Sequence, residues 1–176
     1  MRCQLRRPAL DSCTAVFAYG GQIAVALRRL KFNRRSDIAR GLSPLLSTDF
    51  AIAAQRAELA IPIPLHRRRL ARRGFNQSQR LLLPLAKEAG IPVARGALRR
   101  RRDTAPQAKL SAKERQSNLQ GAFEAAPTLR GKRILLCDDV RTTGSTLDAA
   151  ARALRRAGAT EIHAFVVACA DWDGPC

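Results

Sequence analysis

Residues 132–146 read Lys132-Arg-Ile-Leu-Leu-Cys-Asp-Asp-Val-Arg-Thr-Thr-Gly-Ser-Thr146. The apolar run Ile134–Cys137 is short and unbroken, which is typical of a strand buried on both faces in a parallel sheet covered by helices. Two carboxylates, Asp138 and Asp139, follow at its carboxyl end. Beyond them, apolar residues at helical spacing predict a helix over 147–157. The run therefore predicts an α/β fold in which the acidic pair ends a central strand.

The loop between the acidic pair and this helix is suited to an anion. A helix N-terminus presents unsatisfied N–H groups and the positive end of the helix dipole. Hydroxyl side chains add donors, and a glycine lets the backbone close around a phosphate. Carboxylates only accept hydrogen bonds, which suits a vicinal diol, so a sugar that carries a phosphate would satisfy both parts of the run. The residues of this loop are Thr142, Thr143, Gly144, Ser145 and Thr146.

The same run has two other interpretations. Ser145 or Thr146 could simply cap the helix, with the two aspartates solvated at the strand end. A nucleotide P-loop is excluded, because that motif needs a lysine that the loop lacks.

Other segments extend the α/β pattern. The apolar run Glu161–Ala168 predicts a strand, and with the preceding strand and helix it forms a βαβ unit with parallel strands. Ligands of such sheets lie outside the carboxyl ends of the strands, where the acidic pair falls. Upstream, the pattern predicts helices over 19–32, 36–46, 77–89 and 111–118, and strands over 58–64, 93–98 and 121–123.

Length and composition indicate one domain. The chain has 176 residues, 46% of them hydrophobic, and no apolar run near the ~18 residues of a membrane span. The N-terminus lacks an apolar signal sequence, so a cytoplasmic location is the default expectation. Five cysteines without a C-x-x-C pair argue against a disulfide framework.

The charge is strongly basic. Thirty-two Lys+Arg face 14 Asp+Glu, for a net charge of +18, which predicts a polyanionic partner such as nucleic acid or a pyrophosphate. Between His66 and Arg102 the only acid is Glu88. The alternative is that arginine is simply frequent throughout and serves solubility.

Residues 138–146 resemble the phosphoribosyl pyrophosphate (PRPP) signature of type I phosphoribosyltransferases. Further segments resemble the ComF family of phosphoribosyltransferase-like proteins, which has a role in competence and DNA uptake and includes the GntX type. These segments are Leu27–Phe32, Pro62–Gln77, Thr104–Gln107 and Glu114–Phe123. The resemblance implies a type I phosphoribosyltransferase-like fold, with a mostly parallel central sheet, helices on both faces and a flexible lid loop over 99–115.

The resemblance also implies a domain division. Residues 19–176 form the phosphoribosyltransferase-like domain, and residues 1–18 form an N-terminal segment. Members of the family usually carry a Cys-rich zinc ribbon before the domain, but this segment holds only Cys3 and Cys13. We therefore expect that a ribbon has been lost or is lacking, and that this chain binds no structural zinc.

The chemistry implied by the family is displacement of pyrophosphate from the anomeric carbon of PRPP. Asp138 and Asp139 would be the catalytic pair that holds the ribose hydroxyls and, indirectly, a Mg²⁺ ion, while residues 142–146 would hold the 5-phosphate. Cations would bind the leaving pyrophosphate, and the candidates are Arg67, Arg73, Arg102 and Arg115.

The sequence leaves the acceptor and the activity open. No segment identifies a nucleobase pocket. One alternative is a non-catalytic protein that binds single-stranded DNA along His66–Arg73 and Arg99–Arg102, with Phe75 as the only aromatic residue nearby. Another is a regulator that senses PRPP without turnover, and a homodimer is also left open.

Overall fold

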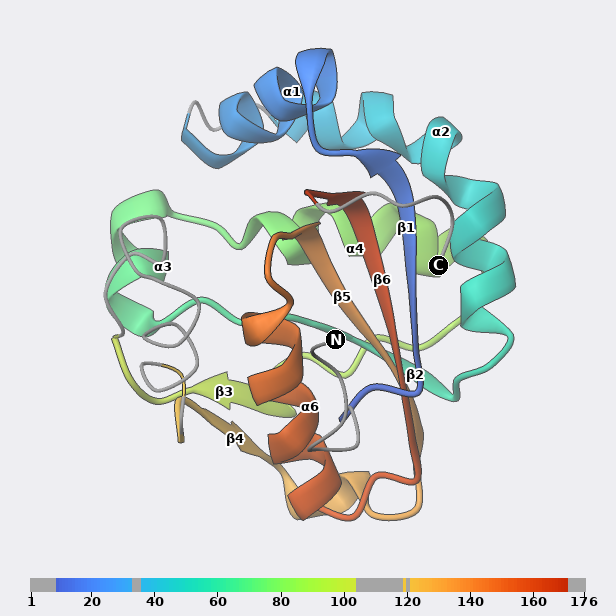
Figure 1. Ribbon diagram of the computed structural model, residues 1–176, viewed down its shortest axis with the longest axis vertical. Coiled ribbons are helices and arrows are strands. Elements are labelled where there is room, and N and C mark those ends of the chain that lie inside the picture. Colours follow the sequence, from blue (N-terminus) through green and yellow to red (C-terminus); the bar gives the residue numbers. More distant parts are fainter. Residues whose placement is uncertain (1–8, 33–35, 104–118, 120, 171–176) are drawn as a thin grey trace, which may run out of the picture.

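The structure, a computed structural model, describes residues 9–32, 36–103, 119 and 121–170. Its centre is a four-stranded sheet in the order β1-β6-β5-β2, in which every neighbouring pair is parallel (Figure 1). The mostly parallel α/β fold expected from the sequence is confirmed. The strands are β1 (Ser12–Ala18), β2 (Leu59–Pro62), β5 (Arg133–Arg141) and β6 (Glu161–Cys169).

Helices cover both faces of this sheet because its inner strands are apolar on both sides. Successive side chains of β5 alternate between two hydrophobic clusters. Ile134 and Leu136 pack with α6 (Ser145–Arg156), whereas Leu135 packs with α2 (Ser36–Ala54) and α4 (Gln77–Glu88).

The carboxyl ends of the strands lie beneath α1 (Gly21–Phe32), which follows β1 (Figure 1). Leu27 and Leu30 of α1 are buried in the same cluster as Phe50 of α2. This packing places the polar end of α1 near the end of β5 that carries the acidic pair.

A smaller antiparallel pair stands beside the central sheet. It consists of β3 (Leu98–Arg100) and β4 (Phe123–Ala125), and a 3-10 turn, η2 (Pro127–Leu129), leads from β4 toward β5. The short helix α3 (Arg67–Arg73) follows β2. It ends at Gly74, whose φ of 81° is left-handed.

The structure corrects several predicted boundaries. β1 lies within residues 1–18, so the central sheet begins before the domain boundary expected at residue 19. The strand predicted over 93–98 is wrong: Val93 makes an isolated bridge with Ala60, and β3 begins at Leu98. Helix α2 continues to Ala54 past the predicted end, and the helix predicted over 111–118 lies outside the described residues.

No helix within the described ranges is both long and apolar enough to cross a membrane.

The core position of Leu136 gives a first prediction. Its side chain is 0% exposed between β5 and α6, so Leu136→Ala should lower the free energy of unfolding by about 2–5 kcal/mol through lost burial and a residual cavity. Leu45, which is 60% exposed on α2, provides the matched control. Leu45→Ala should change stability by less than about 0.5 kcal/mol in the same urea titration. Equal losses for the two variants would contradict the assigned core.

Candidate functional site

The acidic pair belongs to the last part of β5, which extends through both carboxylates to Arg141. Asp138 is half-buried. Its Oδ1 accepts hydrogen bonds from Ser78 Oγ at 2.7 Å and from the backbone N–H of Asp139 at 2.9 Å. One carboxylate oxygen of Asp138 is therefore held by the protein.

Asp139 has different surroundings. Only 3% of it is exposed. Its Oδ1 accepts a hydrogen bond from Gln77 Nε2 at 3.2 Å, and its Oδ2 lies 2.5 Å from Lys31 Nζ. A buried carboxylate is tolerated when its charge is paired and it accepts hydrogen bonds. Lys31 of α1 pairs the charge at Oδ2, and Gln77 of α4 supplies a hydrogen bond to Oδ1.

The start of α4 is fixed by Asn76. Its Oδ1 accepts from the backbone N–H of Ser78 at 3.0 Å, and its Nδ2 donates to the carbonyl of Ile63 at 2.9 Å. This cap ties α4 to the residue after β2. It places Gln77 and Ser78 in the first turn, where each contacts one member of the acidic pair.

The charge of this pair is reflected in the pKa of Asp138. Burial, followed by the neighbouring charge of Asp139, raises the pKa of Asp138 to about 7, while the hydrogen bond from Ser78 and the charge of Lys31 oppose the rise. Near neutral pH, Asp138 can therefore take up or release a proton as its surroundings change.

The hydroxyl-rich loop leads directly from β5 into α6. Thr142 and Thr143 are exposed. Gly144 precedes the helix with a left-handed φ of 72°, and no side chain caps the first turn there. The alternative in which Ser145 or Thr146 caps the helix is not observed, since Gly144 is the N-cap and the helix begins at Ser145.

A cavity of about 430 Å³ is lined in part by this loop. Thr143 Oγ1 and Ser145 Oγ are 2.8 Å apart at its edge. Arg141 and Cys13 also line it. The cavity thus joins hydroxyl donors, a helix N-terminus and Arg141, which suit a phosphate. Asp148 also lines it, and the carboxylate of Asp148 is paired with Arg152 at 2.8 Å.

The arginines predicted to bind pyrophosphate differ in burial and in their contacts. Arg73 is half-buried, and its Nη1 donates to Gln77 Oε1 at 2.5 Å. Burial lowers the pKa of Arg73, and the charge of Asp139 opposes this shift. Arg67 and Arg102 are exposed, and Arg115 lies outside the described residues. Arg73 is connected to the acidic pair through Gln77, which hydrogen-bonds both Arg73 and Asp139.

Sequence reasoning missed Arg100. It is half-buried on β3, and its guanidinium carbon lies 5.4 Å from the centre of the Phe123 ring. Burial and the charge of Arg69 lower the pKa of Arg100, whereas the charges of Asp138 and Asp103 raise it. The sequence marks Arg99–Arg102 as a basic run. Only the alternation of exposed and half-buried side chains along β3 distinguishes Arg100 from its neighbours.

The residues of α1 and α4 beside the pair were also missed. Gln77 and Ser78 stand at a predicted helix start, and polar residues are common there without any further role. Lys31 lies in a segment that resembles the ComF family, but its contact with Asp139 spans most of the chain.

Magnesium fits this set of donors only in part. Mg²⁺ prefers oxygen ligands and keeps much of its coordination shell for substrate phosphates and water. In the part of the chain that the structure describes, no group of three His, Cys, Asp or Glu side chains that could hold a metal ion occurs. Asp138 presents a half-buried carboxylate of the kind that Mg²⁺ prefers.

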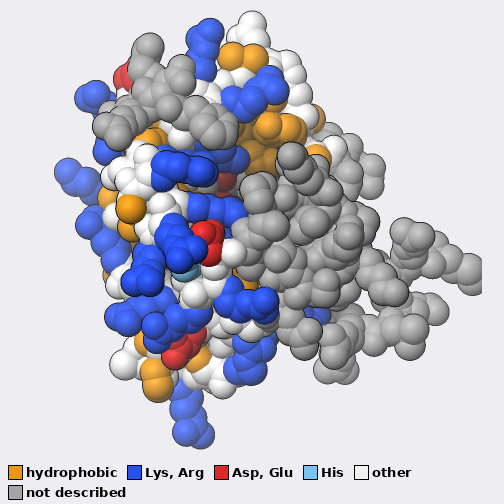
Figure 2. Space-filling view, turned by 90° about the vertical axis from the view of Figure 1, so that its left-hand side faces the viewer, with side chains coloured by type: hydrophobic (Ala, Val, Ile, Leu, Met, Phe, Trp, Pro, Cys, Tyr) orange, Lys and Arg blue, Asp and Glu red, His pale blue; other side chains and the backbone are white. Residues whose placement is uncertain are grey.

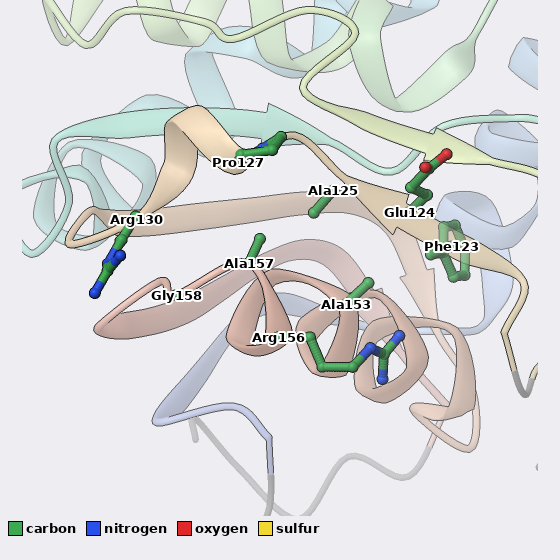
Figure 3. A pocket seen from close by; sticks show the side chains of 9 residues that line it. All are labelled: Phe123, Glu124, Ala125, Pro127, Arg130, Ala153, Arg156, Ala157 and Gly158. Carbon is green, nitrogen blue, oxygen red and sulfur yellow. The ribbon is translucent and has the colours of Figure 1, made fainter.

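A second cavity, of about 660 Å³, lies at the other end of α6 from the loop (Figure 3). Small residues, Ala153 and Ala157, line it, with Arg130 and Arg156 at its edges. None of the predicted site residues contributes to it.

The raised pKa of Asp138 predicts how stability depends on pH. The folded state holds the Asp138 proton up to about pH 7, whereas the unfolded chain releases it near 3.8, so this carboxyl costs stability as pH rises between these values. Asp138→Asn keeps an oxygen for Ser78 and removes the charge. It should raise the free energy of unfolding by about 1–3 kcal/mol at about pH 8, and by little at about pH 4.

Urea titrations at the two pH values measure this difference. Asp49→Asn, at an exposed position of α2, is the control and should leave stability nearly unchanged at both. A gain that is the same at both pH values would show that the charge of Asp138 is not its cause.

Comparisons with known proteins identify the family. Residues 68–175 match the family model of the phosphoribosyl transferase domain. The DNA utilization protein YhgH of Escherichia coli K12 is 37% identical over 169 residues, covering 93% of this chain and 74% of the relative. Competence protein F of Haemophilus influenzae is 34% identical over 174 residues, covering 94% and 76%. Competence protein ComFC of Bacillus subtilis is 29% identical over 156 residues, covering 87% and 62%.

Solved structures show more distant similarity. Glutamine PRPP amidotransferase from B. subtilis, complexed with ADP and GMP, is 22% identical with a TM-score of 0.42, covering 69% of this chain and 26% of that one. The similarity to YhgH and to competence protein F, in contrast, extends over almost the whole chain. The chain therefore belongs to the phosphoribosyl transferase domain family, among the ComF-type proteins of competence and DNA utilization.

Proposed function

We propose that the chain binds Mg·PRPP, or another ribose 5-phosphate, and transfers the phosphoribosyl group to an acceptor with release of pyrophosphate. One observation carries the proposal. A half-buried carboxylate, Asp138, lies in the last part of a central strand, β5, and the N-terminus of α6, which has no side-chain cap at Gly144, follows that strand within a few residues. A diol and a phosphate on the same sugar need such a pair of adjacent groups.

Different residues bind different parts of the ligand. Residues 142–146 bind the 5-phosphate through their hydroxyl and backbone N–H groups, and Asp138 accepts from a ribose hydroxyl. When bound, Mg²⁺ neutralises charge on the pyrophosphate, and Asp138 with Asp139 would hold it indirectly. Arg73 and Arg100 add to the exposed arginines as cations for the leaving group.

The reaction then depends on placement. The acceptor nucleophile forms a bond with the anomeric carbon as the bond from that carbon to pyrophosphate breaks, and the bonding electrons leave with the pyrophosphate. Arginines near the leaving group stabilise this charge. The remaining contribution comes from holding ribose and acceptor in line.

Single-stranded DNA binding is the second candidate, and the exposed arginines favour it. Lys and Arg side chains gather on the face of the molecule shown in Figure 2. Arg67, Arg68 and Arg72 of α3 and Arg99 of β3 are exposed. The relatives are named for DNA utilization and competence. Both candidate functions include a cytoplasmic location. If the chain binds PRPP but transfers no phosphoribosyl group, it is a sensor of PRPP and not an enzyme.

Calorimetry with Mg·PRPP tests the first candidate. Wild-type protein should bind it, and Asp138→Asn should weaken binding by about tenfold or more, because a charge-assisted hydrogen bond to the ribose is removed. Asp49→Asn should bind like the wild type. Absence of binding by the wild-type protein would refute the proposal.

A screen of nucleobases and amines, with pyrophosphate release as the readout, then separates an enzyme from a sensor. Binding without release for any acceptor would favour the sensor.

Fluorescence anisotropy with labelled single-stranded DNA tests the second candidate. Alanine at Arg67, Arg68 and Arg72 should weaken binding and lower the slope of log affinity against log salt by about 0.7 for each phosphate that the variant no longer neutralises. Alanine at Arg28, Arg40 and Arg56, which are exposed on or near α1 and α2, is the matched control for charge. Equal effects in the two triple variants would show that no particular face binds DNA.

A further inference from the structure

Four side chains from four elements form a continuous polar chain beside the site. Lys31 Nζ of α1 lies 2.5 Å from Asp139 Oδ2 of β5. Gln77 Nε2 of α4 donates to Asp139 Oδ1 at 3.2 Å. Arg73 Nη1, at the end of α3, donates to Gln77 Oε1 at 2.5 Å. The buried centre of this chain is Asp139, 3% exposed, with Gln77, 6% exposed.

We propose that Lys31 and Gln77 are positioning residues, which fix Asp139 and through it orient the Arg73 guanidinium toward the ligand. This inference rests on the proposed function, because the ligand it serves is the pyrophosphate of Mg·PRPP. The two carboxylates then have different roles: Asp138 contacts the ribose, whereas Asp139 orients Gln77 and, through Gln77, Arg73.

Chemistry dictates the direction of the Gln77 amide. A carboxylate offers only acceptors, so the Gln77 group that faces Asp139 must be the NH₂. The carbonyl oxygen then faces the other way, and a guanidinium offers only donors to it. Asp139 therefore selects the amide orientation in which Gln77 can hold Arg73.

Lys31 makes this arrangement possible from the opposite side. A buried aspartate beside a second carboxylate loses more from desolvation and repulsion than one hydrogen bond returns. The Lys31 ammonium balances the charge of Asp139 from α1, and its side chain remains 26% exposed, so part of its hydration is kept. Buried ion pairs of this kind contribute little net stability, which favours a role in positioning.

Reaction of Arg73 with phenylglyoxal, followed by mass spectrometry on the ligand-free protein, tests this polar chain. Gln77→Leu should raise the rate at Arg73 several-fold, because the hydrogen bond from Arg73 Nη1 to Gln77 Oε1 is removed. Lys31→Met should raise it as well, because Lys31 is linked to Arg73 through Asp139 and Gln77. Lys87→Met removes an exposed lysine of α4 and should leave the rate unchanged.

Binding of Mg·PRPP tests the purpose of the polar chain. Gln77→Leu should weaken binding by about tenfold in the wild-type background and have little effect in the Arg73→Ala background, because Gln77 acts through Arg73. A purely structural role would give additive effects instead, and would overturn the proposal.

The two experiments distinguish a failure of the proposed function from a failure of this inference. If the wild-type protein binds no Mg·PRPP, the proposed function is refuted, and the phenylglyoxal rates decide the polar chain alone. Unchanged Arg73 rates in Gln77→Leu overturn the inference whatever the binding result. Circular dichroism checks the fold of each variant, and should Lys31→Met not fold, Gln77→Leu carries the test.

Discussion

Two adjacent carboxylates in the last part of a buried strand, β5, are the constraint on which the rest of the site depends. Consecutive residues of a strand point to opposite faces, so Asp138 and Asp139 enter different surroundings. Their charges repel each other, and burial adds a desolvation cost. The arrangement is stable only because Ser78, Gln77 and Lys31 supply donors and a positive charge from two helices.

The surrounding elements are placed accordingly. α4 must begin where its first turn meets β5, and Asn76 ensures this by capping the helix and donating to the carbonyl of Ile63, the residue after β2. Because β2 pairs with β5 in register, with Pro62 opposite Cys137, the cap is tied to the acidic pair through the sheet itself. α1 packs on α2 through Leu30, which brings the neighbouring Lys31 to the carboxyl edge.

Sequence patterns predicted what is local and missed what is distant. The run from Ile134 to Thr146 predicted a strand, an acidic pair and a helix in order, because apolar periodicity and turn chemistry act over a few residues. The ends of the elements were predicted less accurately. The predicted strand stopped before the carboxylates, but β5 includes both of them, since its pairing with β6 continues to Arg141. β1 was missed because its residues are mostly half-buried at a sheet edge, where alternation is weak. Contacts of Lys31 and Gln77 with Asp139 could not be predicted, since no local pattern encodes them.

Burial separates the arginines into two groups that suit different ligands. Arg73 and Arg100 are half-buried, and a hydrogen bond to Gln77 and the face of Phe123 restrict them. Side chains that are already ordered lose little entropy on binding, which suits the fixed geometry of a single pyrophosphate. The arginines of α3 that face solvent keep their hydration and their conformational freedom. Such side chains can follow the phosphates of a flexible polyanion such as single-stranded DNA. One basic chain can therefore serve a small phosphorylated ligand and a nucleic acid with different side chains, so the strong net charge argues against neither candidate function.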